Sequence, residues 1–391
     1  MSMGLKANAD GSGAIQVGGS DAINLSTGLN ATFVQNADLP NTFGFKNRII
    51  NGDMRIDQRN AGASVTIPFT NSQYTLDRWA VQSSQPSKFS LQRNAGSVTP
   101  PVGFTNYLGI TSLSAYSLAT TDYFTVYQAI EGFNFADMAW GTANAATVTL
   151  SFWVRSSLTG TFGGSLRNGT VARSYPFTYT INSANTWEKE TITIAGDTTG
   201  TWDTGNTAAL ILTLGLGVGS NFTGTAGAWA AGNVIVPTGS TSVVGTNGAT
   251  FYITGVQLEK GSTATSFDYL DYGRSLAQCQ RYYYRITSGG IGNRIGMGQV
   301  YSTTNALGYT SFPVTMRVAP SALEQTGTAA NYQITNSALA AQNCSAVPTF
   351  NSADVFQANT IFTVASGLTA GNACLYVTAA ANIYLGWSAE L

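Results

Sequence analysis

The sequence predicts an all-β protein in four parts: an N-terminal docking arm, a central jelly-roll β-sandwich, a short linking helix and a small C-terminal β domain. Most of the chain alternates apolar and polar residues with a period of two, and Gly, Asn, Ser and Thr turns separate the alternating runs. Only one short segment has helical spacing. We place the four parts at residues 1–45, 46–269, 270–288 and 289–391.

The composition excludes several classes of function. Only 9% of the residues are charged and the formal net charge is −1, so the clustered Lys and Arg of a nucleic-acid-binding surface are missing. The chain has no histidine, which excludes Ser–His and Cys–His nucleophiles and the commonest zinc ligands. Such a surface suits burial between subunits or contact with neutral polar ligands such as glycans. We expect no nucleic-acid partner.

The cysteines and the lengths of the apolar runs indicate in which compartment the protein is made and whether it enters a membrane. Cys279, Cys344 and Cys374 are widely spaced and form no CxxC pair, so we expect buried apolar residues, with no metal site and no cofactor. Residues 1–13 contain no apolar core for a signal peptide, and no uninterrupted apolar run reaches the ~18 residues that a membrane span needs. We therefore expect no membrane insertion, and assembly in the cytoplasm unless the protein leaves inside something larger.

The first 45 residues are rich in Gly, Asn, Ala, Ser and Thr. Apolar residues alternate within GSGAIQVGGSDAINLS around a Gly-Gly turn, which is a weak hairpin signal. Two strands alone are marginally stable, so this segment either stays mobile or pairs with other copies or another protein. We favour a docking arm.

The densest charge cluster follows, in NRIINGDMRIDQRNAG at residues 47–62. Asp53, Arg55, Asp57 and Arg59 alternate in sign, so on a strand they would project to one face and pair laterally. We interpret this segment as an ion-paired strand that opens the sandwich. The alternative is a carboxylate site.

The prediction of a sandwich is based on the regular alternation of apolar and polar residues along each predicted strand. The predicted strands are at residues 123–130, 148–154, 177–181, 192–194, 210–218 and 251–258. In the last of these, Tyr252, Thr254, Val256 and Leu258 share one face. One buried and one exposed face per strand predict a two-sheet antiparallel sandwich of jelly-roll type. We expect the glycine-rich loop at residues 217–249 to carry binding groups.

A helix and a second β domain complete the chain. Leu276, Cys279 and Tyr283 are three and four residues apart, and Asp271 is placed to accept from the first free N–H groups of a helical turn. After the helix, residues 289–391 carry only five charged residues, and short strands are predicted at 307–312, 360–364 and 373–377. We expect this domain to bury part of its surface against identical copies.

Seven segments of the chain are distinctive. They are NRIINGDMRIDQRNAG (47–62), LDRW (76–79), QAIEGFNFADMAWGTANAATVTLSFWVRSSLTGTFGG (128–164), RSYPFTYTI (173–181), TGVQLEKGSTATSF (254–267), AQCQRYY (277–283) and FPVTMRVAP (312–320). In this order they resemble a family of bacteriophage tail proteins, tail fibres and related virion components. The resemblance covers residues 45–320.

The resemblance implies a virion protein of the phage tail. The family's central domain is similar to carbohydrate-binding modules of the jelly-roll kind, in which a TGVQLE-type strand closes the sandwich. Its N-terminal arms attach to the phage particle, here through residues 1–45 to other tail or head proteins. Its C-terminal domains point outward in homotrimers.

Candidate binding residues lie in two glycine-containing loops. Glycan recognition uses exposed aromatic faces against sugar C–H surfaces, with amides or carboxylates for the hydroxyls. Trp202 and Asp203 lie in GDTTGTWDTGN and Trp229 lies in GTAGAWAAGN, where a bulky aromatic has little local core to enter. We take Trp202, Asp203 and Trp229 as candidate ligand-binding residues. The alternatives are an intersubunit contact or the capping of a sandwich end.

Other aromatic residues are expected to pack. Trp79 lies inside LDRW, and Trp153 lies on the face opposite Val148 and Val154, so both are interpreted as packing residues. The run Tyr282–Tyr284 follows the predicted helix, and we expect it to pack between domains or around a threefold axis.

No catalytic residue is assigned, and we expect no enzymatic activity. The enzymatic alternative is cleavage of polysaccharide by paired carboxylates, for which Glu188, Glu190, Asp203 and Glu259 lie nearest to predicted ligand loops. Glu188 and Glu190 flank Lys189 in an alternating pattern that suits a solvated strand edge. Depolymerases of this sort also tend to be parallel β-helices, and the sequence shows no repeat of 20–50 residues.

Three hypotheses follow from the sequence. The first is a trimeric, non-enzymatic tail fibre that takes part in host attachment by binding host surface polysaccharide or lipopolysaccharide. The second is a purely structural component, such as a tail adaptor or a head-decoration protein. The third is a glycan depolymerase.

Overall fold

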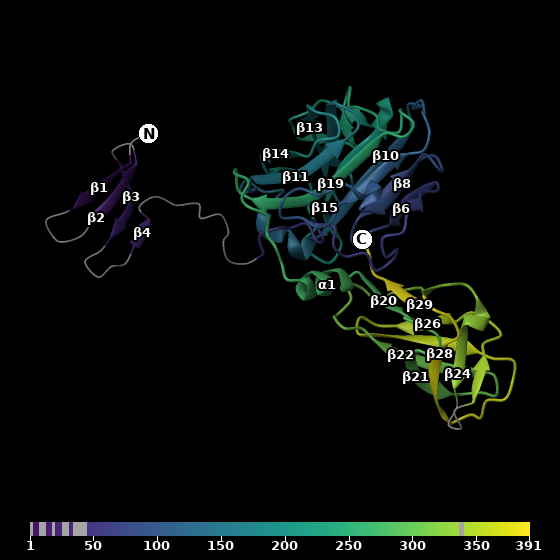
Figure 1. The fold of residues 1–391 in the computed structure, drawn as a ribbon. Helices are drawn as coiled ribbons and strands as arrows, with labels where there is room; N and C mark the ends of the chain where they lie inside the picture. The colour runs from purple at the N-terminus through teal and green to yellow at the C-terminus, as the bar shows by residue number, and fades with distance from the viewer. Residues whose placement is uncertain (1–2, 8–12, 18–19, 26–30, 34–44, 336–339) are drawn as a thin grey trace.

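The structure is a computed structural model that describes residues 3–7, 13–17, 20–25, 31–33, 45–335 and 340–391. Figure 1 shows a β-sandwich, a single labelled helix, α1, and a second β domain beyond it. All the strand pairs of the described residues are antiparallel except that of β16 (Thr223–Gly224) with β18 (Val236–Pro237). The prediction of an all-β protein with one short helix is confirmed.

The N-terminal strands form a sheet of their own. Its order is β1 (Met3–Ala7), β2 (Gly13–Val17), β3 (Ser20–Leu25) and β4 (Ala31–Phe33). The predicted hairpin is present, because β2 and β3 pair antiparallel. Its predicted Gly18-Gly19 turn lies outside the described residues.

Two sheets form the sandwich. Sheet I has the order β17 (Ala230–Ala231), β13 (Arg173–Ile181), β12 (Gly160–Asn168), β15 (Ala208–Val218), β10 (Tyr123–Glu131), β7 (Ala80–Ser83) and β6 (Thr70–Tyr74). Sheet II has the order β14 (Glu188–Ile194), β11 (Val148–Ser156), β19 (Thr250–Lys260), β9 (Leu108–Ser112), β8 (Phe89–Arg93) and β5 (Val65–Thr66).

The strand order is that of a jelly roll. Eight strands form the jelly roll: β9, β10, β11, β12, β13, β14, β15 and β19, which we number one to eight in chain order. In spatial order, sheet I then contains strands five, four, seven and two, and sheet II contains strands six, three, eight and one. Successive strands therefore cross repeatedly between two antiparallel sheets, as a double Greek key requires. The predicted jelly-roll sandwich is confirmed.

Alternation along each strand builds the core between the sheets. In β15 the leucines at 210, 212, 214 and 216 are buried in one cluster with Val148, Leu150, Phe152 and Val154 of β11. Trp153 points away from this cluster and is partly exposed, as predicted. Trp79 is fully buried, and its indole Nε1 donates to Asn51 O at 3.0 Å.

The prediction for the face of β19 is wrong. Val256 and Leu258 enter the main core, whereas Tyr252 lies on the opposite face and packs on Tyr107 with ring centroids 5.1 Å apart. The phase changes at Gly255, where φ is +61° and the register with β11 shifts. A bulge of this kind inverts the alternation beyond it. A Cβ at Gly255 would lie 2.6 Å from Cζ of Phe104, so glycine is required there.

The prediction of an ion-paired strand at residues 47–62 is also wrong, because this segment consists of turns. Asn51 and Met54 have positive φ angles of 57° and 59°, which a strand does not allow. The carboxylate of Asp57 accepts from the backbone N–H of Asn60 and of Gly62, at 2.9 and 2.6 Å, so it stabilises a turn. Side-chain charges here pair with other parts of the chain more than with each other.

Helix α1 (Tyr272–Gln280) joins the two domains. The Asp271 carboxylate accepts from Arg274 N at 3.0 Å, which confirms the predicted N-cap. The helix ends before Tyr283, which the helical spacing had included and which instead begins β20. Elsewhere in the described residues, five 3₁₀ turns lie at Ala95–Ser97, Gly132–Asn134, Ala136–Met138, Ser220–Phe222 and Ala329–Asn331.

The C-terminal domain contains two sheets. The smaller has the order β20 (Tyr283–Thr287), β29 (Tyr384–Ser388) and β23 (Glu324–Gln325). The larger, sheet III, has the order β25 (Ala341–Asn343), β24 (Tyr332–Thr335), β28 (Ala373–Thr378), β21 (Arg294–Val300), β22 (Asn305–Ser311), β27 (Gln357–Thr363) and β26 (Thr349–Ala353). All three cysteines are buried and free, as predicted.

Charged and tyrosine side chains fasten the C-terminal domain to the sandwich. Arg59 and Arg78 of the sandwich segment both pair with Glu390, which is 5% exposed. Arg281 pairs with Glu131 at 2.5 Å, and the Tyr282 hydroxyl donates to the same carboxylate at 2.6 Å. We call these six residues the junction. They confirm that the tyrosine run packs between domains; packing around a threefold axis stays a prediction.

Candidate functional site

A cleft of about 350 Å³ opens on the outer face of sheet I. The floor of the cleft is formed by residues that are paired across three neighbouring strands: Arg167 of β12, Ile211 of β15 and Ala129 of β10. Tyr127 lies one row further along β10, opposite Thr213. Residues of the same strands with the other parity, including Leu212, are buried in the core. We call this hollow the sheet-face cleft.

The glycine-rich loop forms one wall of the cleft, and glycines on the sheet surface make room for it. A Cβ at Gly215 would lie 2.4 Å from Val236 Cγ1, and one at Gly163 would lie 2.6 Å from Pro237 Cδ. The loop can therefore lie directly on the sheet, and it contributes Phe222 to the cleft together with Asn233 and Ile235. This agrees with the expectation that the loop at 217–249 carries the groups of a potential site.

Arg167 is the charged residue of the cleft floor, and it is 3% exposed. Its Nη1 donates to Asn233 Oδ1 at 2.6 Å and its Nη2 donates to Thr213 Oγ1 at 2.8 Å, while Nε has no partner in the protein. Burial lowers the pKa of the guanidinium to about 10, which still leaves it charged at neutral pH. The positive charge is therefore held in place by neutral groups only.

Two tyrosines add ring surface and hydroxyl groups to the cleft. The Tyr127 hydroxyl donates to Ser72 Oγ at 2.8 Å, and burial raises the pKa of this phenol. Tyr123 is partly exposed and meets Phe222 edge to face, with ring centroids 5.7 Å apart. Aromatic faces beside amide groups are the side-chain types that contact sugar rings and their hydroxyls.

The predicted ligand residues Trp202 and Trp229 lie together, but away from the cleft. They belong to an aromatic cluster with Trp140, in which Trp202 lies 4.7 Å from Trp140 and 5.5 Å from Trp229 between ring centroids. Trp202 is 8% exposed and donates from Nε1 to Thr199 O, while the partly exposed Trp229 donates to Ala195 O. Each indole N–H is thus satisfied by backbone, as in a packed end of a sandwich.

Asp203 shapes its own loop, because its Oδ1 accepts from Gly205 N at 2.7 Å. Neither Asp203 nor the two tryptophans line the sheet-face cleft. Of the three residues, Trp202 is buried, whereas Asp203 and Trp229 are partly exposed. Ligand contact by Trp202, Asp203 and Trp229 stays a prediction.

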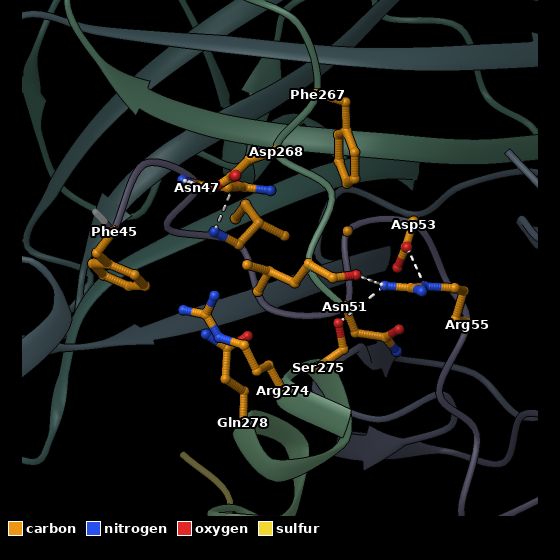
Figure 2. A pocket seen from close by; sticks show the side chains of 13 residues that line it. Phe45, Asn47, Asn51, Asp53, Arg55, Phe267, Asp268, Arg274, Ser275 and Gln278 are labelled. Atoms are coloured by element: carbon orange, nitrogen blue, oxygen red, sulfur yellow. Dashed lines mark hydrogen bonds and ion pairs between the residues drawn. The ribbon is translucent and has the colours of Figure 1, made fainter. Parts of the chain in front are cut away.

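A second, polar pocket of about 180 Å³ lies where the linking helix meets the sandwich. Figure 2 shows Phe45 and Phe267 on opposite sides of it, with Arg274 and Ser275 contributed by helix α1. Its polar groups are engaged with each other. Arg55 pairs with Asp53 and also donates to Ser275 Oγ at 3.0 Å, and the pKa of Asp53 is raised by burial although Arg55 opposes this. We assign this pocket to the packing of the linker.

Three of the four acidic residues considered for catalysis, Glu188, Asp203 and Glu259, accept hydrogen bonds within the fold. Glu259 is 2% exposed and accepts from the side chains of Gln257 and Thr265. Glu188 lies on edge strand β14 and accepts from the backbone of Asn182 and Ser183. No Asp or Glu side chain of the described residues lines the sheet-face cleft.

Among the residues that the structure describes, no three Cys, Asp or Glu side chains lie close enough together to hold a metal ion. No helix within the described ranges has the length and apolar character to span a membrane.

No protein-family model and no curated protein matches this sequence. Three similar solved structures are the enzymatically active domain of bacteriophage CBA120 tailspike protein 4, a Clostridium thermocellum family 11 carbohydrate-binding module in complex with a β-1,3-1,4-mixed-linked tetrasaccharide, and a putative sugar binding protein from Bacteroides thetaiotaomicron. Their sequence identities to this chain are 12%, 11% and 10%, with TM-scores of 0.28, 0.26 and 0.31.

The matches cover 47%, 52% and 55% of this chain. They span the whole length of the carbohydrate-binding module and of the putative sugar binding protein, but only 20% of the tailspike chain. Because the TM-scores are low, the jelly-roll assignment rests on the strand order of the molecule itself.

Proposed function

We propose that this protein is a virion component of a phage tail, of tail-fibre type, that binds a host cell-surface glycan without cleaving it. The observation that carries the proposal is the sheet-face cleft, which places Tyr123, Tyr127 and Phe222 beside the side-chain amides of Gln82 and Asn233 on a jelly-roll sandwich. Rings that cover sugar C–H surfaces and amides that bind hydroxyls are both required for glycan recognition. The phage assignment is supported by the sequence motifs alone.

The absence of Asp and Glu side chains of the described residues from the cleft lining favours binding over hydrolysis. Cleavage of a glycosidic bond uses a pair of Asp or Glu side chains on either side of the scissile bond, about 5–9.5 Å apart. The described lining supplies no such pair. In this proposal, residues 1–45 attach the protein to other tail or head proteins, and the glycan is a host polysaccharide or lipopolysaccharide.

A homotrimer is the assembly we propose. On the outer face of sheet III, Met297 is 68% exposed and lies between Tyr309, which is 51% exposed, and Leu375 in the strand register. Leu307 and Ile361 continue this stripe in neighbouring strands. A contiguous apolar sheet face on a domain with few charges is suited to burial against identical copies.

Light scattering on the purified protein tests the assembly. We expect the mass of three chains, and we expect the double substitution Met297→Lys with Tyr309→Lys to give the mass of one chain, because it places charges in the buried stripe. Phe133→Lys is the matched control, since Phe133 is 65% exposed on the sandwich. A wild-type monomer at micromolar concentration would contradict the proposed assembly.

Glycan arrays and whole-cell binding test the function. We expect the purified protein to bind host cells and a subset of surface glycans, and Tyr123→Ala to weaken this binding, because Tyr123 is partly exposed in the cleft. Release of reducing sugar from host polysaccharide would show a depolymerase instead. No binding to any cell or glycan would favour a purely structural tail adaptor or head-decoration protein.

A further inference from the structure

Three arginines of the described chain are at most 5% exposed, and they are neutralised differently. Arg48 is 5% exposed and pairs with Asp137, and Arg78 is 1% exposed and pairs with Glu390. Arg167 is 3% exposed and has no carboxylate within salt-bridge distance among the described residues. Removing a charge from water without a counter-charge is costly, so this arrangement needs an explanation.

The guanidinium of Arg167, which lines the cleft, keeps N–H donors that no group of the protein accepts. It has five N–H groups, of which two are used for Asn233 and Thr213. The Nε–H has no partner in the protein either, but this nitrogen is itself buried. The second N–H groups of Nη1 and Nη2 are therefore the donors we assign to an oxyanion in the cleft.

We propose that the sheet-face cleft takes an acidic saccharide, and that Arg167 binds the singly charged anionic group of that sugar, a carboxylate or a sulfate ester. This inference rests on the proposed glycan-binding function and specifies the class of glycan. The anion neutralises the buried charge, while the partly exposed Tyr123 contacts the ring. With no Asp or Glu side chain of the described residues in the lining to repel it, an acidic sugar meets the positive charge of Arg167 in the cleft.

The rest of the chain distinguishes this site from a general attraction to polyanions. The formal net charge is −1, so long-range attraction of acidic polymers is weak. Binding of an acidic sugar must then come from one buried cation in a shaped cleft. We therefore expect recognition of single acidic residues in an oligosaccharide, with selectivity that depends on Arg167.

The experiment compares matched ligands on the intact protein. Calorimetry is carried out with galacturonic-acid and glucuronic-acid oligosaccharides, with their neutral methyl esters, and with sulfated oligosaccharides. We expect at least one acidic series to bind about tenfold or more tightly than its neutral counterpart, since a hydrogen-bonded charge pair contributes this much. The carboxylated and sulfated arms show which anion the cleft takes.

Variants then assign the effect to the residue. In Arg167→Gln the preference for the acidic series should disappear, and in Arg167→Lys it should be reduced but present, because a charge remains without the planar fork. Arg155→Gln is the matched control: it removes the same charge from sheet II, where Arg155 lies over the Tyr252 ring, and should leave the preference unchanged. Thermal unfolding checks that each variant is folded.

The outcomes separate the two proposals. Equal binding of acids and methyl esters by the wild-type protein overturns the role of Arg167 but leaves glycan binding intact, and this comparison does not depend on any variant folding. A preference that survives in Arg167→Gln overturns the role as well. Absence of binding to every acidic and neutral glycan overturns the proposed function and this inference together.

Discussion

The junction and the sheet-face cleft both bury an arginine, and they treat its charge in opposite ways. At the junction, Arg78 pairs with Glu390 and stacks on the Tyr282 ring, with its guanidinium carbon 3.6 Å from the ring centroid. In the cleft, Arg167 meets only the neutral oxygens of Asn233 and Thr213. A charge that fixes two domains is neutralised within the chain, whereas one that lines an opening is left without a counter-charge. The difference separates an architectural role from a binding role.

The largest effect is expected at the junction. Glu390→Gln leaves Arg59 and Arg78 buried without their shared carboxylate. Because removing one partner of a buried ion pair leaves an uncompensated charge, we expect the free energy of unfolding to fall by about 3–5 kcal/mol. Urea denaturation measures this change. Glu188→Gln on an exposed edge is the control, and a loss below about 1 kcal/mol in Glu390→Gln would contradict this account of the junction.

A pH effect of intermediate size is expected from Asp77, which lies beside the junction. Burial raises its pKa from the ordinary 3.8 to about 6, although Arg59 and the hydrogen bonds from Gln58 oppose this. The folded state therefore binds the proton more tightly than the unfolded state. The contribution to stability is complete below about pH 4, and it is lost as the pH rises through 6.

Comparison with Asp77→Asn isolates this group from the other carboxylates. The unfolding free energy of the wild type, relative to that of the variant, should fall by up to about 3 kcal/mol between pH 4 and pH 6. Denaturant titrations at a series of pH values measure the difference. Parallel pH profiles for the two proteins would show that Asp77 is charged in the fold across this range.

The smallest stability effect is expected at Arg167, and it sharpens the contrast with Arg78. In Arg167→Met, the loss of two hydrogen bonds to neutral groups is offset by the release of an uncompensated buried charge. We expect the free energy of unfolding to change by less than about 1 kcal/mol, while Arg78→Met lowers it by several times more. Equal losses in the two variants would mean that Arg167 serves the fold as Arg78 does.

Much of the fold follows from local patterns in the sequence. The leucines of β15 predict a strand with one buried face, and Asp271 predicts the start of the helix, because both signals depend only on neighbouring residues. The predictions of strand position and strand face fail where the backbone departs from regular strand geometry. The positive φ of Gly255 shifts the phase of β19, and the turns around Asn51 replace a predicted strand. Alternating charges at 53–59 could not reveal these turns.

The site was less predictable than the fold. Arg167 follows an inward-facing leucine in a strand, so its expected place is a solvated sheet surface. It is buried because the loop carrying Asn233, 66 residues later, lies across that surface. The glycines at 215 and 217 that alternate with the leucines of β15 were the available signal for this loop. Trp202 was singled out by its glycine-containing loop, but packing with Trp140 accounts for its surroundings.

The junction also determines how the molecule responds to pulling. Residues 389–391 return to the sandwich, where Arg317 donates to the carbonyl oxygens of Ala389, Glu390 and Asn206, and the Tyr74 hydroxyl donates to Leu391 O. The C-terminal domain is thus fastened near both of its ends, by helix α1 and by this returning segment (Figure 1). Two attachments side by side prevent the free rotation of one domain relative to the other that a single linker allows. We expect a force applied to the sandwich to rotate the two domains together, as one rigid body.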